Sequence, residues 1–108
     1  MTYEEKLEYI INLGWVNTGD WNNRSFYSLM YDGELMGQLV EHNGNWYISK
    51  GNDMYYIGDL SVEVIKEYTN ILKALIKTIK ENITPRNKHL LSIALLEASR
   101  SVARRKVK

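Results

Sequence analysis

Residues 24–58, RSFYSLMYDGELMGQLVEHNGNWYISKGNDMYYIG, decide the fold. Within this stretch, Asp32-Gly33, Asn43-Gly44 and Gly51-Asn52 are dipeptides that favour tight hairpin turns. Between them, apolar or aromatic residues alternate with polar ones, as in strands that pack one face on a core. The spacing predicts a four-stranded antiparallel meander over residues 24–31, 34–41, 46–50 and 53–58.

The turn positions also predict the register of the strands. Pairing through them places Met30 opposite Leu35, Phe26 opposite Leu39, Leu39 opposite Ile48, Ile48 opposite Tyr55 and Trp46 opposite Ile57. These residues form the predicted core face. Because a strand alternates its side chains, the other face is predicted to carry four tyrosines together with two methionines: Tyr27, Tyr31, Tyr47, Tyr56, Met36 and Met54.

The flanking segments have helical signals. Thr2 and Glu5 have capping-box spacing, which predicts a helix over 3–13. Apolar residues at helical spacing predict a second helix over 61–82, and Thr84-Pro85 predicts the start of a third over 85–104. Residues 15–24 are predicted to be a strand end followed by a loop. The predicted fold is a single α+β domain over 1–108: a short N-terminal helix, the meander, a C-terminal helical hairpin on one sheet face, and a basic tail at about 104–108.

Charge divides the chain into two halves. Residues 1–60 carry three basic and nine acidic residues, whereas residues 61–108 carry eleven basic and four acidic ones. Oppositely charged surfaces attract different partners, so this division favours a protein that works by binding. The abundance of Asn, Ile, Lys and Tyr is typical of AT-rich genomes, such as those of low-GC bacteria and their phages.

The residues offer little for catalysis. His42 and His89 lie in different predicted elements and there is no cysteine, so no metal site is predicted. The glycines are isolated and no serine lies in a nucleophile elbow. We therefore predict no catalytic residue, metal or cofactor. There is no run of about 18 apolar residues, which argues against a membrane span, and the cysteine-free chain with its acidic start is predicted to be cytoplasmic.

Three features are candidate partner-binding surfaces. The first is the tyrosine face, and the second is Trp21 in an Asn-rich loop. The third is a stripe on the third helix where Ile93 and Leu96 lie among basic residues. Each has a structural alternative: half-buried strand tyrosines, a tryptophan lid over the core, and a helix buried on two sides.

These observations favour a non-enzymatic protein that binds another macromolecule, with a homodimer as one form of that contact. The most specific hypothesis is a small phage or mobile-element inhibitor of a host nucleic-acid enzyme, such as a CRISPR nuclease, whose basic groove the acidic half would fill. The alternative is a nucleic-acid-binding accessory protein with weak, non-specific affinity. Its phosphate contacts would come from the basic C-terminal residues Arg100, Arg104, Arg105, Lys106 and Lys108.

Overall fold

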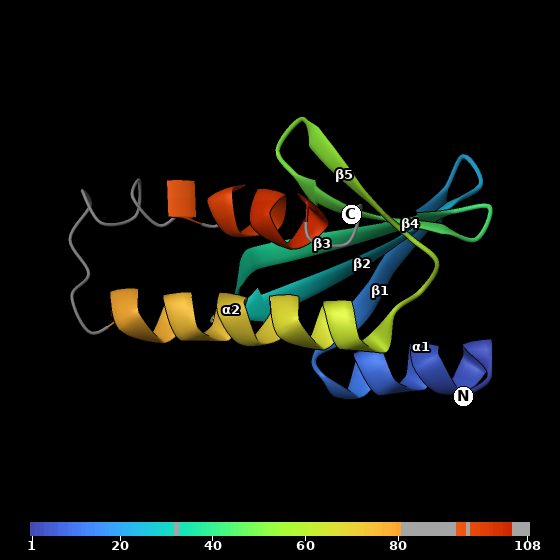
Figure 1. The fold of residues 1–108 in the computed structure, drawn as a ribbon, viewed down its shortest axis with the longest axis horizontal. Helices are drawn as coiled ribbons and strands as arrows, with labels where there is room; N and C mark the ends of the chain where they lie inside the picture. Colours follow the sequence, from blue (N-terminus) through green and yellow to red (C-terminus); the bar gives the residue numbers. More distant parts are fainter. Residues whose placement is uncertain (32, 81–92, 95, 105–108) are drawn as a thin grey trace.

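The computed structural model of the chain, which describes residues 1–31, 33–80, 93–94 and 96–104, has an α+β fold with a five-stranded antiparallel sheet (Figure 1). The strands follow one another in the order β1-β2-β3-β4-β5. The elements are α1 (Tyr3–Asn12), β1 (Trp15–Trp21), β2 (Arg24–Tyr31), β3 (Glu34–His42), β4 (Asn45–Lys50), β5 (Asp53–Gly58) and α2 (Val62–Lys80). A third helix contains residues 93–94 and 96–104.

The sheet has one strand more than predicted. Trp15–Trp21 forms β1, which pairs with β2 through a turn at Asn22 and Asn23. Both asparagines have a left-handed backbone, with φ angles of 56° and 62°. Asparagine tolerates this conformation better than most residues, which allows a two-residue hairpin here. The prediction of a loop over this segment is therefore wrong.

The three predicted hairpins are confirmed, but the register of β2 differs from the prediction. Met30 lies opposite Leu35 as expected, but both are about half exposed, so their predicted core positions are wrong. The next pair is Leu29 with Gly37, so Met36 is an extra residue in β3. This β-bulge shifts the pairing by one residue. Beyond it, the partner of Leu39 is Tyr27, and Phe26 is paired with Val40 instead. The predicted core position of Phe26 is therefore wrong, and Tyr27 occupies it.

The pairing of β4 agrees with the prediction except at one end. Ile48 lies opposite both Leu39 and Tyr55, as expected. Trp46 pairs with Gly58 rather than with Ile57, because a second irregularity lies between Trp46 and Tyr47. Trp46 is nevertheless fully buried, as predicted.

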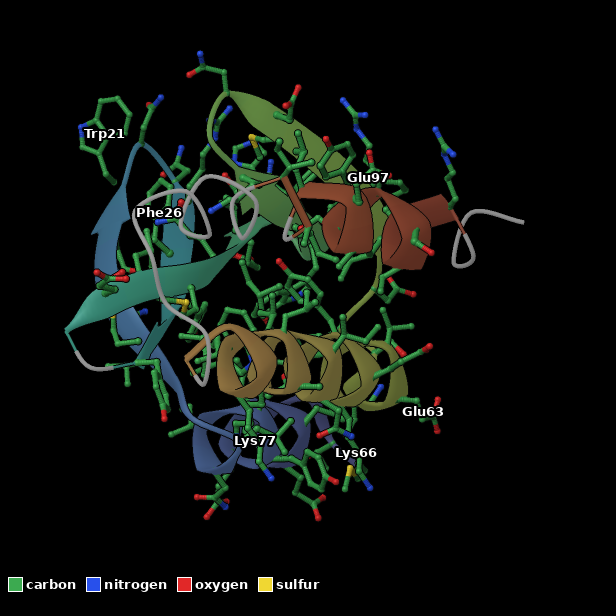
Figure 2. All side chains as sticks on the ribbon, turned by 90° about the vertical axis from the view of Figure 1, so that its left-hand side faces the viewer. Trp21, Phe26, Glu63, Lys66, Lys77 and Glu97 are labelled. Carbon is green, nitrogen blue, oxygen red and sulfur yellow. The ribbon has the colours of Figure 1, made fainter. Side chains whose placement is uncertain are left out.

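The core lies between the sheet and the helices, which Figure 2 shows on one side of the sheet. Gly37 makes close packing with α2 possible, because a Cβ atom there would lie 2.7 Å from Leu72 Cδ1. The Tyr68 and Ser99 hydroxyls are 2.9 Å apart and join α2 to the third helix. Burial raises the pKa of the Tyr68 phenol. The third helix also contributes Val102 and Ala103 to the core.

The first helix has the predicted start. The Thr2 side chain accepts a hydrogen bond from the Glu5 backbone N–H, and the Glu5 side chain accepts one from the Thr2 N–H. At its other end, Lys73 Nζ donates to the Leu13 carbonyl at 3.1 Å, so α1 is held against α2.

Candidate binding surfaces

One end of the molecule is acidic. It lies at the right in Figure 1, where α1 begins and where the β1–β2 and β3–β4 turns meet. Tyr3 of α1 lies close enough to β3 that its phenol pKa is raised, mainly by burial and then by the Glu41 carboxylate. Lys6 shares a hollow with Asp59 and Glu63, which places the start of α2 beside α1. We call this region the acidic end; its charged residues are Glu4, Glu5, Asp20, Glu41, Asp59 and Glu63 with Lys6 and Arg24.

Trp21 is the most exposed aromatic side chain among the described residues. Its side chain is 71% exposed, and Figure 2 shows it pointing away from the fold. It borders a shallow hollow of about 490 Å³ that also includes Asp20 and Glu41. The His42 Nδ1 atom lies 3.1 Å from the Asn23 carbonyl oxygen and connects the two turns. Trp21 therefore lies beside a turn that is hydrogen-bonded to its neighbour, and it does not cover the core, where Trp15 is fully buried instead.

The face of the sheet opposite the helices, the open face, carries part of the predicted tyrosine surface. The rings of Tyr47 and Tyr56 lie 5.5 Å apart, and the Tyr56 hydroxyl donates to Asn45 Oδ1 at 3.2 Å. Tyr56 is 49% exposed. These two tyrosines lie on the open face as predicted.

The other two predicted tyrosines do not join them. Tyr27 is only 8% exposed and its ring lies 5.4 Å from that of Trp46, so the prediction that it lies on the outer face is wrong. The bulge at Met36 in β3 is the reason, because it shifts the pairing with β2 by one residue, so that β2 presents Tyr27 and Leu29 to the core instead of Phe26 and Met30. Tyr31 is 40% exposed but lies at the end of the β2–β3 hairpin, opposite Glu34.

A groove separates β5 from the third helix. It has a volume of about 410 Å³ and is lined by Met54, Tyr55, Tyr56, Arg100, Ala103 and Arg104. Arg100 Nε donates to the Tyr55 hydroxyl at 3.2 Å, which is the main reason that the pKa of Arg100 is raised. We call this the edge groove. It brings Arg100 and Arg104, predicted as phosphate contacts, beside Tyr56 of the tyrosine surface.

Sequence reasoning missed this groove. Tyr55 was predicted as a core residue, and it is half-buried at the groove. The available signal was that β5 ends the meander and that Arg100 and Arg104 are spaced by one helical turn. On the same helix, Ile93 is exposed and Leu96 is half-buried. Arg105, Lys106 and Lys108 lie outside the described residues.

Neither metal ligands nor membrane segments stand out in the part of the chain that the structure describes. No three His, Cys, Asp or Glu side chains there are grouped so that they could hold a metal ion. None of the helices in that part is long and apolar enough to cross a membrane. Comparison with protein-family models, curated proteins and solved structures finds no match for this chain. Function is therefore inferred from the surfaces themselves.

Proposed function

We propose that this chain is a non-enzymatic protein that binds another protein through its acidic end, with Trp21 as the anchor. The observation that carries this proposal is the 71% exposure of Trp21 on a turn connected to its neighbour by His42. Tryptophan is enriched among the residues that dominate interface energetics. Tryptophan supplies a large contact area with only two rotatable side-chain bonds, and the turn beside it is hydrogen-bonded to the neighbouring turn, so its burial should cost little conformational freedom.

The charge around Trp21 supports a basic partner surface. The acidic end has six carboxylates and two basic side chains among the described residues. Grooves that bind nucleic acid are lined with Lys and Arg, because these neutralise phosphates. An acidic end that carries an exposed aromatic residue is complementary to such a groove. The specific form of the proposal is therefore an inhibitor of a nucleic-acid enzyme, encoded by a phage or mobile element, with a CRISPR nuclease as one such target.

Affinity capture from a bacterial host lysate, quantified by mass spectrometry, tests this function. The wild-type protein and the Trp21→Ala and Glu41→Lys variants serve as baits. Met30→Ala is the matched control, because Met30 is also exposed but lies at the opposite end of β2. We expect a nucleic-acid-binding protein that is captured by wild type and by the control, lost with Trp21→Ala and Glu41→Lys, and displaced by duplex DNA. Equal capture by all four baits would contradict the proposal.

Nucleic-acid binding at the edge groove is a second candidate function. The observation in its favour is that Arg100 and Arg104 line the same groove as Tyr56, where a base could stack while the guanidinium groups contact phosphates. Fluorescence anisotropy with labelled single-stranded and duplex DNA tests it. Binding that weakens steeply with salt, and less steeply for Arg100→Gln with Arg104→Gln, would support this candidate. Absence of binding at low salt would remove it.

A further inference from the structure

The outer edge of β5 is open to pairing. β5 is the last strand of the described sheet, in which β4 is its one neighbour. Within the described part of the chain, the hydrogen bonds of β5 outside this ladder come from the Tyr55 and Tyr56 hydroxyls. Among the described residues, no hydrogen bond from another element reaches the backbone of β5, so its outward N–H and C=O groups can pair with another strand.

Both outer strands of the sheet have an irregularity, but the one in β5 lies near its end, at Ile57, outside the part that lines the edge groove. In β1 an irregularity between Asn17 and Gly19 interrupts the ladder, and the Gly19 N–H is taken by the Asn17 side chain at 3.0 Å. The pairing of β5 with β4, in contrast, is regular from Asp53 to Tyr56, which includes the part that lines the edge groove. β5 has no Lys or Pro, the residues that commonly block edge pairing.

The charges beside this edge change sign along it. Asp53 and Glu97 both lie near enough to Arg100 to favour its charged form. Arg104 follows one helical turn later in the same groove. Figure 1 shows β5 and the third helix both running from left to right, with β5 drawn at an angle to the helix. The edge groove is therefore lined by two arginines, and among the described residues the carboxylates of Asp53 and Glu97 lie only at the Arg100 end, so that Arg104 is the guanidinium group without a neighbouring carboxylate.

We propose that β5 pairs antiparallel with β5 of a second copy of this chain. The resulting dimer is two-fold symmetric, and its two sheets join into one continuous sheet with the helices of both copies on the same side. A two-fold axis between antiparallel edges places the acidic start of each groove opposite the basic end of the other. Arg104 of each copy then faces Asp53 and Glu97 of the other copy.

This self-complementarity favours a second copy over a uniformly acidic or basic ligand. A ligand of one charge sign would meet a like charge at one end of the groove. Two copies in antiparallel pairing match opposite charges at both ends. The exposed Met54 side chain adds apolar area near the axis. The dimer uses no residue of the acidic end. A test that rules out the dimer therefore leaves the proposed function standing, and a test that rules out the proposed function leaves the dimer standing.

Sedimentation velocity over a range of concentrations tests the dimer. We expect the wild-type protein to associate to a dimer, Met54→Lys to weaken association at least about tenfold, and Met30→Lys, in an equally exposed position of β2, to leave it unchanged. Circular dichroism checks that each variant is folded. A wild-type protein that is monomeric throughout, or a dimer unaffected by Met54→Lys, would overturn the proposal.

A charge exchange tests the predicted geometry directly. Asp53→Arg alone creates two like-charge contacts in the dimer, and Arg104→Glu alone creates four, because position 104 faces both Asp53 and Glu97; each variant should associate more weakly than wild type. When the two variants are mixed, both contacts between positions 53 and 104 become pairs of opposite charges, and Glu97 faces a like charge on one side only, so the heterodimer should form more readily than either homodimer. A mixture that associates no better than the single variants would overturn the antiparallel arrangement.

Discussion

Trp15 Nε1 donates a 2.8 Å hydrogen bond to Thr69 Oγ1, and both residues are fully buried. The bond connects the edge strand β1 to α2 across the core. Trp46, the other fully buried tryptophan, has no hydrogen-bond partner for its Nε1 atom among the described residues. The Tyr3 hydroxyl lies close to Trp46 but does not reach full hydrogen-bond geometry.

Because of this difference, replacement of each tryptophan by phenylalanine should lower the free energy of unfolding by different amounts. Trp15→Phe removes a ring and a hydrogen bond, whereas Trp46→Phe removes a ring and an unpaired N–H group. We expect Trp15→Phe to lower the free energy of unfolding by about 1–3 kcal/mol more than Trp46→Phe does. Urea denaturation monitored by circular dichroism measures both. Equal costs, or a larger one for Trp46→Phe, would show that the Thr69 contact contributes nothing.

Gly37→Ala should destabilise the protein through steric overlap. The new Cβ atom would lie 2.7 Å from Leu72 Cδ1 and 3.1 Å from Trp15 Cη2, and both of these residues are fully buried. Overpacking of this kind costs about 1–3 kcal/mol. Thermal or urea unfolding measures the loss. In a Leu72→Ala background the overlap with Leu72 is gone, so the added cost of Gly37→Ala should shrink; full additivity would argue against the contact.

The capping box predicts a pH dependence. Hydrogen bonds from the Thr2 backbone and side chain lower the pKa of the Glu5 carboxyl in the folded protein. A lowered folded pKa contributes stability above the unfolded pKa, and this contribution is lost as pH falls through the folded value. Glu5→Gln should therefore be less stable than wild type at neutral pH, and the difference should narrow below about pH 4. Unfolding midpoints across this range test it; a difference independent of pH would contradict the carboxylate's role.

The bulge at Met36 predicts which tyrosine the core requires. Tyr27→Ser removes a buried ring that contacts Trp46 and should cost about 3–5 kcal/mol, in the range of large-to-small aromatic substitutions. Tyr56→Ser, on the open face, should cost about 0.5 kcal/mol or a little more because its side chain is half exposed. Chemical denaturation ranks the two variants. A larger loss of stability for Tyr56→Ser than for Tyr27→Ser would instead support the register predicted without the bulge.

Sequence predicted the parts of the fold that depend on local signals. Asn43-Gly44 and the Thr2–Glu5 spacing have well-defined conformational preferences, and both produce the expected turn and cap. The extra residue Met36 has no such signal, because a bulge in a strand leaves the composition unchanged while it reverses every side chain beyond it. The turn between β1 and β2 was not predicted. Its two residues, Asn22 and Asn23, have a left-handed backbone, but in sequence they resemble an ordinary polar loop.

The candidate surfaces also divide into those that local sequence signals predict and those that depend on contacts between distant elements. The exposure of Tyr56 agrees with its predicted strand face, whereas the sequence leaves open whether Trp21 is an exposed anchor or a lid over the core, and the β1–β2 hairpin that places it in solvent was not predicted. The edge groove depends on the approach of the third helix to β5, a contact between residues 45 positions apart such as Arg100 and Tyr55. Periodicity describes each element alone, so it cannot predict which two elements enclose a groove.

Photo-crosslinking from position 21 tests the proposed function most directly. A photoreactive benzoylphenylalanine replaces Trp21, and the same group at position 30 is the control. In host lysate we predict a covalent adduct from position 21 to a nucleic-acid-binding protein, absent from position 30 and abolished by excess duplex DNA. No adduct from position 21, or the same adducts from both positions, would contradict binding through the acidic end.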